Sequence, residues 1–231
     1  MRAAVAVPYW GAPLGEDERI SLRHLDAYLG RYDRYTVSAG EALPGLEVKR
    51  FPRRFFRDPI TYSRLLLSKR FYEAFSDYDY LLVYQLDCLV LRDDLDAWCR
   101  RGLDYVGAPW LPGPAARFVD EPAVGNGGFS LRRVEAFLQV LDAAGERYAR
   151  RWVAGRADSR FEAHEDLFWS FEAKSFRPDF RIATVEEALR FAFEVEPHRA
   201  FELARGNLPF GAHAWAKYDR AFWEPQLLRD S

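Results

Sequence analysis

Apolar residues along this chain come in short uninterrupted runs that alternate with stretches of helical spacing. The runs at 3–7 and 80–86 consist almost entirely of Ala, Val, Leu and Tyr. Such runs are typical of strands that are buried on both faces of an α/β sheet. We predict strands at 3–7, 35–37, 46–48, 80–86, 104–107, 127–131 and 180–183.

The predicted helices lie between these strands. In residues 17–29, for example, Ile20, Leu25 and Leu29 fall on one face. Strands that alternate with helices predict an α/β fold, here a single Rossmann-like domain whose mainly parallel central sheet is flanked by helices. We expect the Gly- and aromatic-rich segment 207–223 to fold back over the functional site. We predict helices at 17–29, 62–75, 94–101, 133–144, 165–173 and 185–192, with loops at 50–60 and 111–124.

Composition narrows the class of protein. The 231 residues, 49% of them hydrophobic, suit one domain over 1–231 with a sizeable core. A formal net charge of −2 gives no electrostatic reason to expect nucleic acid or an anionic membrane as a partner. No apolar run reaches ~18 residues and no basic-then-apolar leader is present, so we expect no transmembrane segment and no signal peptide. Cys88 and Cys99 are expected to be buried thiols in a reducing cytoplasm.

A Gln and an Asp close the second apolar run. Residues two apart on a strand share a face, so we expect Gln85 and Asp87 to point the same way while Leu86 packs behind them. Ligands of open α/β sheets collect at the carboxyl ends of strands, and a carboxylate in apolar surroundings needs a positive partner. A divalent metal holding a phosphorylated ligand fits this position. On the residues alone, an Asp87 that caps the turn and pairs with an arginine is an equal alternative.

Six short motifs then follow in a fixed order. They are Gln85-Leu-Asp87, Gly107-Ala-Pro-Trp110, Gly125-Asn-Gly-Gly-Phe-Ser-Leu-Arg132, His164-Glu-Asp-Leu-Phe-Trp169, Phe191-Ala-Phe-Glu194 and Pro209-Phe-Gly-Ala-His-Ala-Trp215. This series resembles the DUF5672 family, a group of proposed glycosyltransferases related to the GT-A fold. The resemblance runs from about Tyr62 to Trp223. It implies transfer of a sugar from a nucleotide-diphosphate sugar to a hydroxyl-bearing acceptor, a glycan or a small molecule.

The resemblance also implies a Mn²⁺ or Mg²⁺ site. GT-A enzymes typically carry an Asp-x-Asp motif; here Gln85 takes the first position, as in DUF5672 relatives, and Asp87 the second. Asp87 would ligate the metal together with the donor's diphosphate. Gln85 would bind the metal weakly, bind a water of its shell, or contact the ribose. His213, from the C-terminal loop, is the second proposed ligand, and a hydrogen bond to backbone is its alternative.

Glu165 and Asp166 open a predicted helix, where the helix dipole favours acidic residues whatever their function. In inverting GT-A enzymes an acidic residue at such a helix start takes the proton from the acceptor hydroxyl. By resemblance Asp166 is the proposed general base, with Glu165 as the substitute. We expect backbone amides at the helix start to keep Asp166 ionised. A zinc-protease motif is excluded, because it would require a second histidine where Phe168 stands.

The remaining assignments concern the donor and the sugar. Glycines at 125–128 allow close approach of a ligand to the backbone, although a tight turn explains them nearly as well. Residues at the end of the first strand and on the helix after residue 62 are expected near the base or phosphates, and two tryptophans near the sugar, with core packing as the alternative. The role of Glu194 does not follow from the sequence, and a structural salt bridge is its alternative. The proposed donor- and sugar-contacting residues are Pro8, Tyr9, Tyr62, Ser63, Lys69, Gln85, Trp110, Asn126, Gly127, Gly128 and Trp215.

Two other function classes compete with this interpretation. The first is a catalytically silent carbohydrate- or nucleotide-binding module on the same fold, which Gln85 in place of a second Asp favours. The second is a nucleotidyltransferase. That class usually shows a Gly-rich basic loop near the N-terminus, and Val5-Ala-Val-Pro-Tyr-Trp10 contains none.

Overall fold

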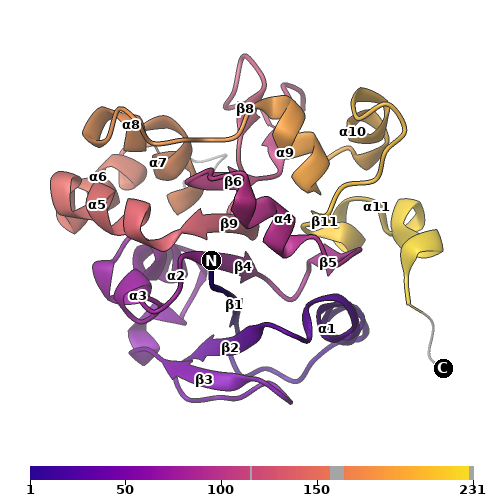
Figure 1. The fold of residues 1–231 in the computed structure, drawn as a ribbon, viewed down its shortest axis with the longest axis horizontal. Coiled ribbons are helices and arrows are strands. Elements are labelled where there is room, and N and C mark those ends of the chain that lie inside the picture. Colours follow the sequence, from indigo (N-terminus) through magenta and orange to yellow (C-terminus); the bar gives the residue numbers. More distant parts are fainter. Residues whose placement is uncertain (115, 157–163, 229–231) are drawn as a thin grey trace.

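The computed structural model describes residues 1–114, 116–156 and 164–228. These residues form a central sheet of six strands in the order β3-β2-β1-β4-β9-β6, which Figure 1 shows stacked from bottom to top. Strand β9 is antiparallel to both of its neighbours, and the other pairings are parallel. The predicted mainly parallel α/β sheet is therefore confirmed. The strands are β1 Ala3–Pro8, β2 Asp33–Ser38, β3 Glu47–Arg50, β4 Tyr80–Tyr84, β6 Tyr105–Gly107 and β9 Phe129–Arg133.

Helices cover both faces of this sheet because side chains alternate along the buried strands. Val5 and Leu82 pack with α1 (Glu16–Leu29), α4 (Leu95–Arg100) and α9 (Val185–Phe191). Ala4 and Leu81 face the other way and pack with the second group of helices. That group comprises α2 Pro59–Leu66, α3 Lys69–Glu73, α5 Val134–Ala144, α6 Glu146–Ala154, α7 Glu165–Phe171 and α8 Ala173–Phe176.

A small second sheet lies beside the main one, at the right of Figure 1. Its strands β10 (Ala192–Phe193), β11 (Gly211–Ala212) and β5 (Leu89–Val90) have two residues each. Helices α10 (Pro197–Leu203) and α11 (Trp215–Trp223) pack on it through a third apolar cluster that includes Trp215. The shorter elements are β7 Pro109–Trp110, which pairs with β8 Ala123–Val124, and the 3-10 helices η1 Arg53–Phe55 and η2 Glu224–Gln226.

The helix predicted at 62–75 is wrong as one element, because the chain forms α2 and α3 with a break at Leu67–Ser68. Polar side chains bond the backbone groups that the break releases. The Ser68 hydroxyl donates to the Leu65 carbonyl at 2.6 Å, and the Lys69 N–H donates to Glu146 Oε1 at 2.7 Å. A helix interruption whose orphan groups find such partners costs little. The helix predicted at 165–173 divides in the same way into α7 and α8.

Three further predictions need correction. The strand predicted at 80–86 ends at Tyr84, so that Gln85 and Asp87 lie in a turn. No strand forms at 180–183 within the described residues; Ile182 makes only an isolated bridge to Tyr105. The Tyr105 N–H donates to the Arg181 carbonyl and the Ala183 N–H donates to the Tyr105 carbonyl, so this segment pairs with β6 at a single residue. The loop predicted at 50–60 contains η1 and the first turn of α2, and α6 was not predicted.

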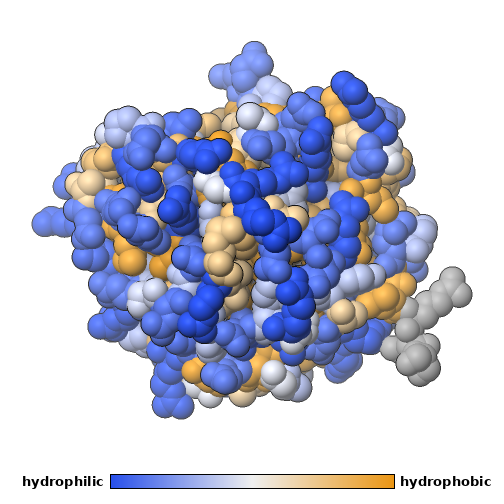
Figure 2. Space-filling view, viewed as in Figure 1, coloured by the Kyte–Doolittle hydropathy of each residue, from blue (hydrophilic) through white to orange (hydrophobic). Residues whose placement is uncertain are grey.

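Figure 2, which shows the face of Figure 1, is largely hydrophilic, with apolar residues in small separate patches. None of the helices in the described part of the chain combines the length and the hydrophobicity that a bilayer crossing requires.

Candidate functional site

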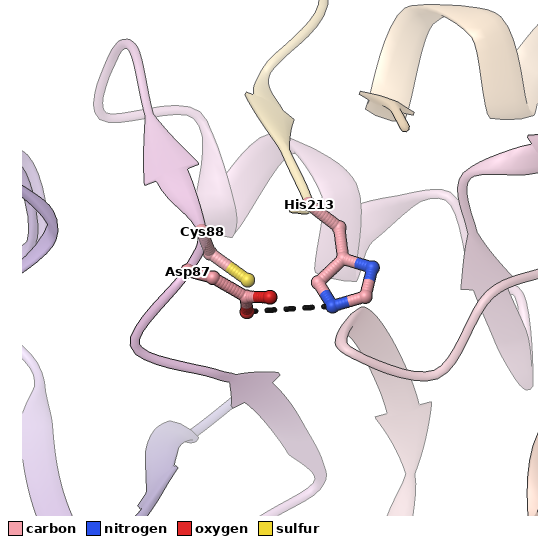
Figure 3. A group of neighbouring side chains, drawn as sticks. All are labelled: Asp87, Cys88 and His213. Atoms are coloured by element: carbon pink, nitrogen blue, oxygen red, sulfur yellow. Dashed lines mark ion pairs between the residues drawn. The ribbon is translucent and has the colours of Figure 1, made fainter. Parts of the chain in front are cut away.

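The small sheet brings together three side chains that are distant in sequence. Asp87 precedes β5, His213 follows β11 and Glu194 follows β10. Because β5 runs antiparallel to β11, and β10 runs parallel to it, these three positions meet at one end of the sheet. Figure 3 shows the Asp87 carboxylate and the His213 ring pointing toward each other. We call Asp87, His213 and Glu194 the Asp87 cluster.

Both ring nitrogens of His213 face acceptor oxygens. Nδ1 lies 3.0 Å from Glu194 Oε1, while Nε2 lies 3.2 Å from Gln85 Oε1 and 3.4 Å from Asp87 Oδ1. Burial lowers the pKa of His213, but Asp87 and then Glu194 outweigh burial and raise this pKa to about 10. Burial opposes ionisation of Asp87, yet the charge of His213 and its hydrogen bond hold the pKa of Asp87 below its ordinary value. The prediction that Gln85 and Asp87 lie on a strand was wrong, but the turn still brings both side chains to His213.

A divalent metal fits the Asp87 cluster. Oδ1 of Asp87 is buried, and its partner among the described residues is His213 Nε2 at 3.4 Å, a long distance for a hydrogen bond. One ligand atom each from Asp87, Cys88 and His213 lies within 4.8 Å of the others. Carboxylate and imidazole suit Mn²⁺. Burial keeps the pKa of Cys88 well above its usual value, and its thiol donates to the Gly128 carbonyl at 3.3 Å, so Cys88 remains a neutral neighbour.

A second group of charged side chains lies at the start of α7. Arg132 on β9 pairs with Glu165 at 2.7 Å, and both side chains are almost fully buried. The Asp166 carboxylate accepts the Gly127 N–H at 3.1 Å and the Leu167 N–H at 2.9 Å. We call Arg132, Glu165 and Asp166 the Asp166 cluster.

The prediction that the helix start keeps Asp166 ionised is wrong, because the surroundings of Asp166 favour its protonated form. Burial, and next the charge of Glu165, raise the pKa of Asp166 well above its ordinary value. The hydrogen bond from Gly127 acts in the other direction but is outweighed. The start of a helix favours an ionised carboxylate, but desolvation by burial has the larger effect on Asp166. Asp166 therefore holds its proton more tightly than an ordinary aspartic acid.

Arg132 belongs to one of the six motifs, but its role does not follow from the sequence. Its guanidinium also reaches Ser130 Oγ at 2.9 Å, Tyr72 Oη at 3.0 Å and the Gly127 carbonyl at 3.2 Å. The strand sequence carried a signal, because Arg132 alternates with the core residues Phe129 and Leu131 and must face the opposite side. A buried arginine requires an acidic partner.

The loop before β9 joins the two clusters. A Cβ added to Gly128 would lie 2.2 Å from His213 Nε2, and one on Gly127 would lie 2.8 Å from Glu165 Oε1. Asn126 donates to Glu194 Oε1 at 3.0 Å and accepts from the Gly128 N–H at 2.8 Å. The space that these glycines leave is therefore occupied by side chains of both clusters.

A cavity of about 620 Å³ lies between the clusters and is lined by members of both. Tyr62, Ser63 and Trp110 line it as well, and Lys217 and Tyr218 of α11 complete its rim. This arrangement agrees with the prediction that segment 207–223 folds back over the site. The residues of the sequence assignment that line the cavity are Tyr62, Ser63, Gln85, Asp87, Trp110, Asn126, Gly127, Gly128, Glu165, Asp166 and His213.

Four assigned residues lie elsewhere. Pro8 and Tyr9 line an adjoining cavity of about 270 Å³ that also reaches Gln85 and Asp87. Lys69 is not brought to the site, because its ammonium pairs with Asp142 on another groove. Trp215 is wholly buried in the core, so its expected contact with a sugar does not fit; its backbone N–H donates to the Asp87 carbonyl at 3.2 Å.

A family described as "Protein of unknown function (DUF5672)" matches residues 45–213. The chain belongs to the DUF5672 family. No curated protein sequence matches it significantly. Solved structures resemble this DUF5672 protein in fold, at sequence identities too low to carry more than the fold.

Three of these structures are glycosyltransferases. The galactosyltransferase LgtC, solved with donor and acceptor sugar analogs, has a TM-score of 0.57 at 14% identity, covering 98% of this chain and 100% of its own. A glycosyltransferase involved in glycosylation of the major capsid of PBCV-1 has a TM-score of 0.54 at 12% identity, with 97% and 98% covered. Mouse xyloside xylosyltransferase 1 has a TM-score of 0.53 at 13% identity, with 92% and 96% covered. The DUF5672 protein thus has the GT-A fold.

Proposed function

We propose that this DUF5672 protein transfers a sugar from a nucleotide-diphosphate sugar to a hydroxyl of a glycan or small-molecule acceptor. In this proposal residues 1–231 form one GT-A domain. The observation that carries it is the pair of clusters across one cavity. One cluster offers a buried carboxylate oxygen whose contact with His213 is long, at 3.4 Å, and the other offers a carboxyl group of raised pKa.

The Asp87 cluster would hold Mn²⁺ or Mg²⁺ through Asp87 Oδ1 and His213 Nε2. Glu194 accepts from His213 Nδ1, which would turn Nε2 toward the ion and fix the tautomer that a ligand requires. When bound, the ion would offset negative charge on the diphosphate. Gln85 would contact the ribose or a water near the ion. Pro8 and Tyr9 would bind the nucleoside in the adjoining cavity.

The Asp166 cluster would serve the acceptor. Ionised Asp166 takes the proton of the acceptor hydroxyl. At the same time the oxygen of that hydroxyl forms a bond to the sugar C1, and the bond from C1 to the diphosphate breaks. Attack opposite the leaving group would invert the anomeric configuration. A carboxylate of raised pKa is the stronger base, and a positioned base contributes ~10²–10⁴-fold to rate. The Arg132–Glu165 pair and the Gly127 N–H would fix its position.

A binding module without catalysis is the second candidate. Its specific support is Gln85, a neutral side chain that contacts His213 where an acidic one would strengthen the metal site. Both candidates bind nucleotide sugars, so binding alone does not separate them.

Release of nucleotide diphosphate separates them. The protein is incubated with a panel of nucleotide sugars and acceptors in Mn²⁺ or in EDTA, and both the nucleotide and the sugar product are followed. We expect release that requires Mn²⁺, that Asp87→Asn abolishes, and that gives a product of inverted configuration. Asp94→Asn is the control, because Asp94 is a surface carboxylate paired with Arg92. Metal-dependent binding without release from any donor would favour the binding module.

A further inference from the structure

A second groove, of about 770 Å³, lies on the opposite side of α2 from the cavity. Tyr62 and Ser63 face the cavity, whereas Thr61 and Arg64 face this groove. Residues one and two positions apart on a helix point in widely different directions, so α2 forms the wall between the two spaces. The other walls come from η1, α3 and α6. We call this space the arginine groove.

The charge of the arginine groove differs from that of the whole chain. The chain carries a formal net charge of −2. The described residues that line the groove include six cationic and two acidic side chains. They are Arg54, Arg57, Arg64, Lys69, Arg70 and Arg150, with Glu73 and Glu146.

Most of these cations have no acidic partner. Lys69 pairs with Asp142, and Arg150 pairs with Glu146. Within the described parts of the chain, the exposed Arg57, Arg64 and Arg70 form no ion pair. Three unpaired guanidinium groups around one hollow create a strong positive potential.

Another groove of the molecule shows that a groove lined by arginines does not always leave most of them without acidic partners. This other groove, of about 840 Å³, is lined by Arg92, Arg101, Arg190 and Arg205, and the first three of these have acidic partners. There Arg92 pairs with Asp94 and Arg190 with Glu186. Arg101 lies over the Trp98 ring at 4.2 Å and pairs with Glu187. Within the described residues, the arginine groove thus holds more guanidinium groups without an ion pair than this other groove does.

We propose that the arginine groove binds phosphate groups carried by the acceptor. Guanidinium groups bind phosphate through paired hydrogen bonds, and a phosphomonoester brings up to about two negative charges. The width of one helix, ~10 Å, separates the groove from the cavity, so an acceptor can cross the N-terminal edge of α2 and reach both. The acceptor role rests on the proposed function, whereas phosphate binding does not. Among the described lining residues only Phe55 is apolar, so the groove lacks the apolar surface that insertion into a membrane uses.

Direct binding of inorganic tripolyphosphate tests the groove without any activity. Calorimetry is carried out in EDTA on the wild type, on the triple variant Arg57→Gln/Arg64→Gln/Arg70→Gln, and on the matched control Arg92→Gln/Arg101→Gln/Arg190→Gln. We expect the wild type and the control to bind equally, with affinity that falls as salt rises. The groove variant should bind at least about tenfold more weakly, the effect of losing charge-assisted hydrogen bonds. No binding by the wild type, or equal loss in both variants, would overturn the proposal. Melting curves by circular dichroism confirm that both variants fold.

Two further experiments show whether the phosphate belongs to an acceptor or to a lipid headgroup. With an active acceptor, tripolyphosphate should raise KM in the wild type and leave it unchanged in the groove variant, with kcat constant in both. An unchanged KM in the wild type would overturn the acceptor role. Flotation with phosphatidylglycerol vesicles, against phosphatidylcholine vesicles, should show no binding; capture that the groove variant loses would assign the groove to a membrane surface. If the wild type binds tripolyphosphate but shows no sugar transfer, the proposed function fails and the phosphate site stands.

Discussion

The two clusters that face each other across the cavity are built in opposite ways. The Asp87 cluster lies at the ends of two-residue strands, and the Asp87 side chain is 48% exposed. In the Asp166 cluster the Arg132 side chain is wholly buried, and that of Glu165 is 6% exposed. One cluster leaves a buried carboxylate oxygen with a long contact to His213, at 3.4 Å, whereas four neighbouring groups surround the guanidinium of the other.

This difference suits the Asp87 cluster to binding a ligand and the Asp166 cluster to holding a carboxyl group in position. A buried oxygen that lacks a close hydrogen bond destabilises the folded chain, and a ligand that completes its coordination reverses that loss. A closed network has no such vacancy, and its contribution is to hold one carboxyl group in one place. We therefore expect variants of the Asp87 cluster to change ligand affinity, and variants of the Asp166 cluster to change turnover and stability.

The largest effect is expected for Asp166→Asn. The change keeps the shape of the side chain and removes the base, so turnover should fall by ~10²–10⁴-fold while binding of the nucleotide sugar stays nearly constant. Steady-state kinetics and calorimetry measure the two quantities, with Asp94→Asn as the control. Turnover within a few-fold of the wild type, or a product that keeps the donor's anomeric configuration, would remove Asp166 from the mechanism.

Arg132→Met should cause the next largest effect, on stability. It leaves Glu165 buried without its partner, and breaking a buried pair in this way costs ~3–5 kcal/mol. Urea unfolding measures the loss. The double variant Arg132→Met/Glu165→Leu removes both charges and should recover most of it, because an apolar pair of similar volume is often neutral. If the double variant is as unstable as the single one, the loss comes from packing and not from the unpaired carboxylate.

The sequence predicted the frame of the molecule better than the contacts of its site. Long apolar runs such as 80–84 specify central strands, because periodicity and burial act along one segment. The two-residue strands around His213 carry no such pattern, since pairing between distant segments makes them. The raised pKa of Asp166 also depends on the approach of Glu165 and on burial, which no spacing rule reports. Glu194 received no role because its partners, His213 and Asn126, meet it only in the folded chain.

A smaller effect is expected for Glu194→Gln, which tests the support of the Asp87 cluster. Loss of such a partner of a metal-binding histidine typically weakens metal binding by ~10–100-fold. Calorimetry with Mn²⁺ measures the affinity. Glu196→Gln is the matched control, because Glu196 pairs with Arg199 at the surface. An unchanged Mn²⁺ affinity in Glu194→Gln would show that Glu194 does not orient His213.

The smallest effect is a change in the slope of stability against pH, and it concerns the Asp166 cluster alone. Folding raises the pKa of Asp166 above its unfolded value of ~3.9, so between the two values the native chain binds more protons than the unfolded chain. This contribution to stability is complete below the unfolded pKa, and it is lost as the pH rises through the folded pKa. Asp166→Asn removes it, so between the unfolded and the folded pKa the variant should lose stability with rising pH less steeply than the wild type, by at most ~1.4 kcal/mol per pH unit, and above the folded pKa the two slopes should converge. Urea unfolding of both proteins in EDTA, from about pH 5 to about pH 9, measures the two slopes. Parallel curves over that range would mean that Asp166 titrates as an ordinary aspartic acid, and that the closed network around it does not raise its basicity.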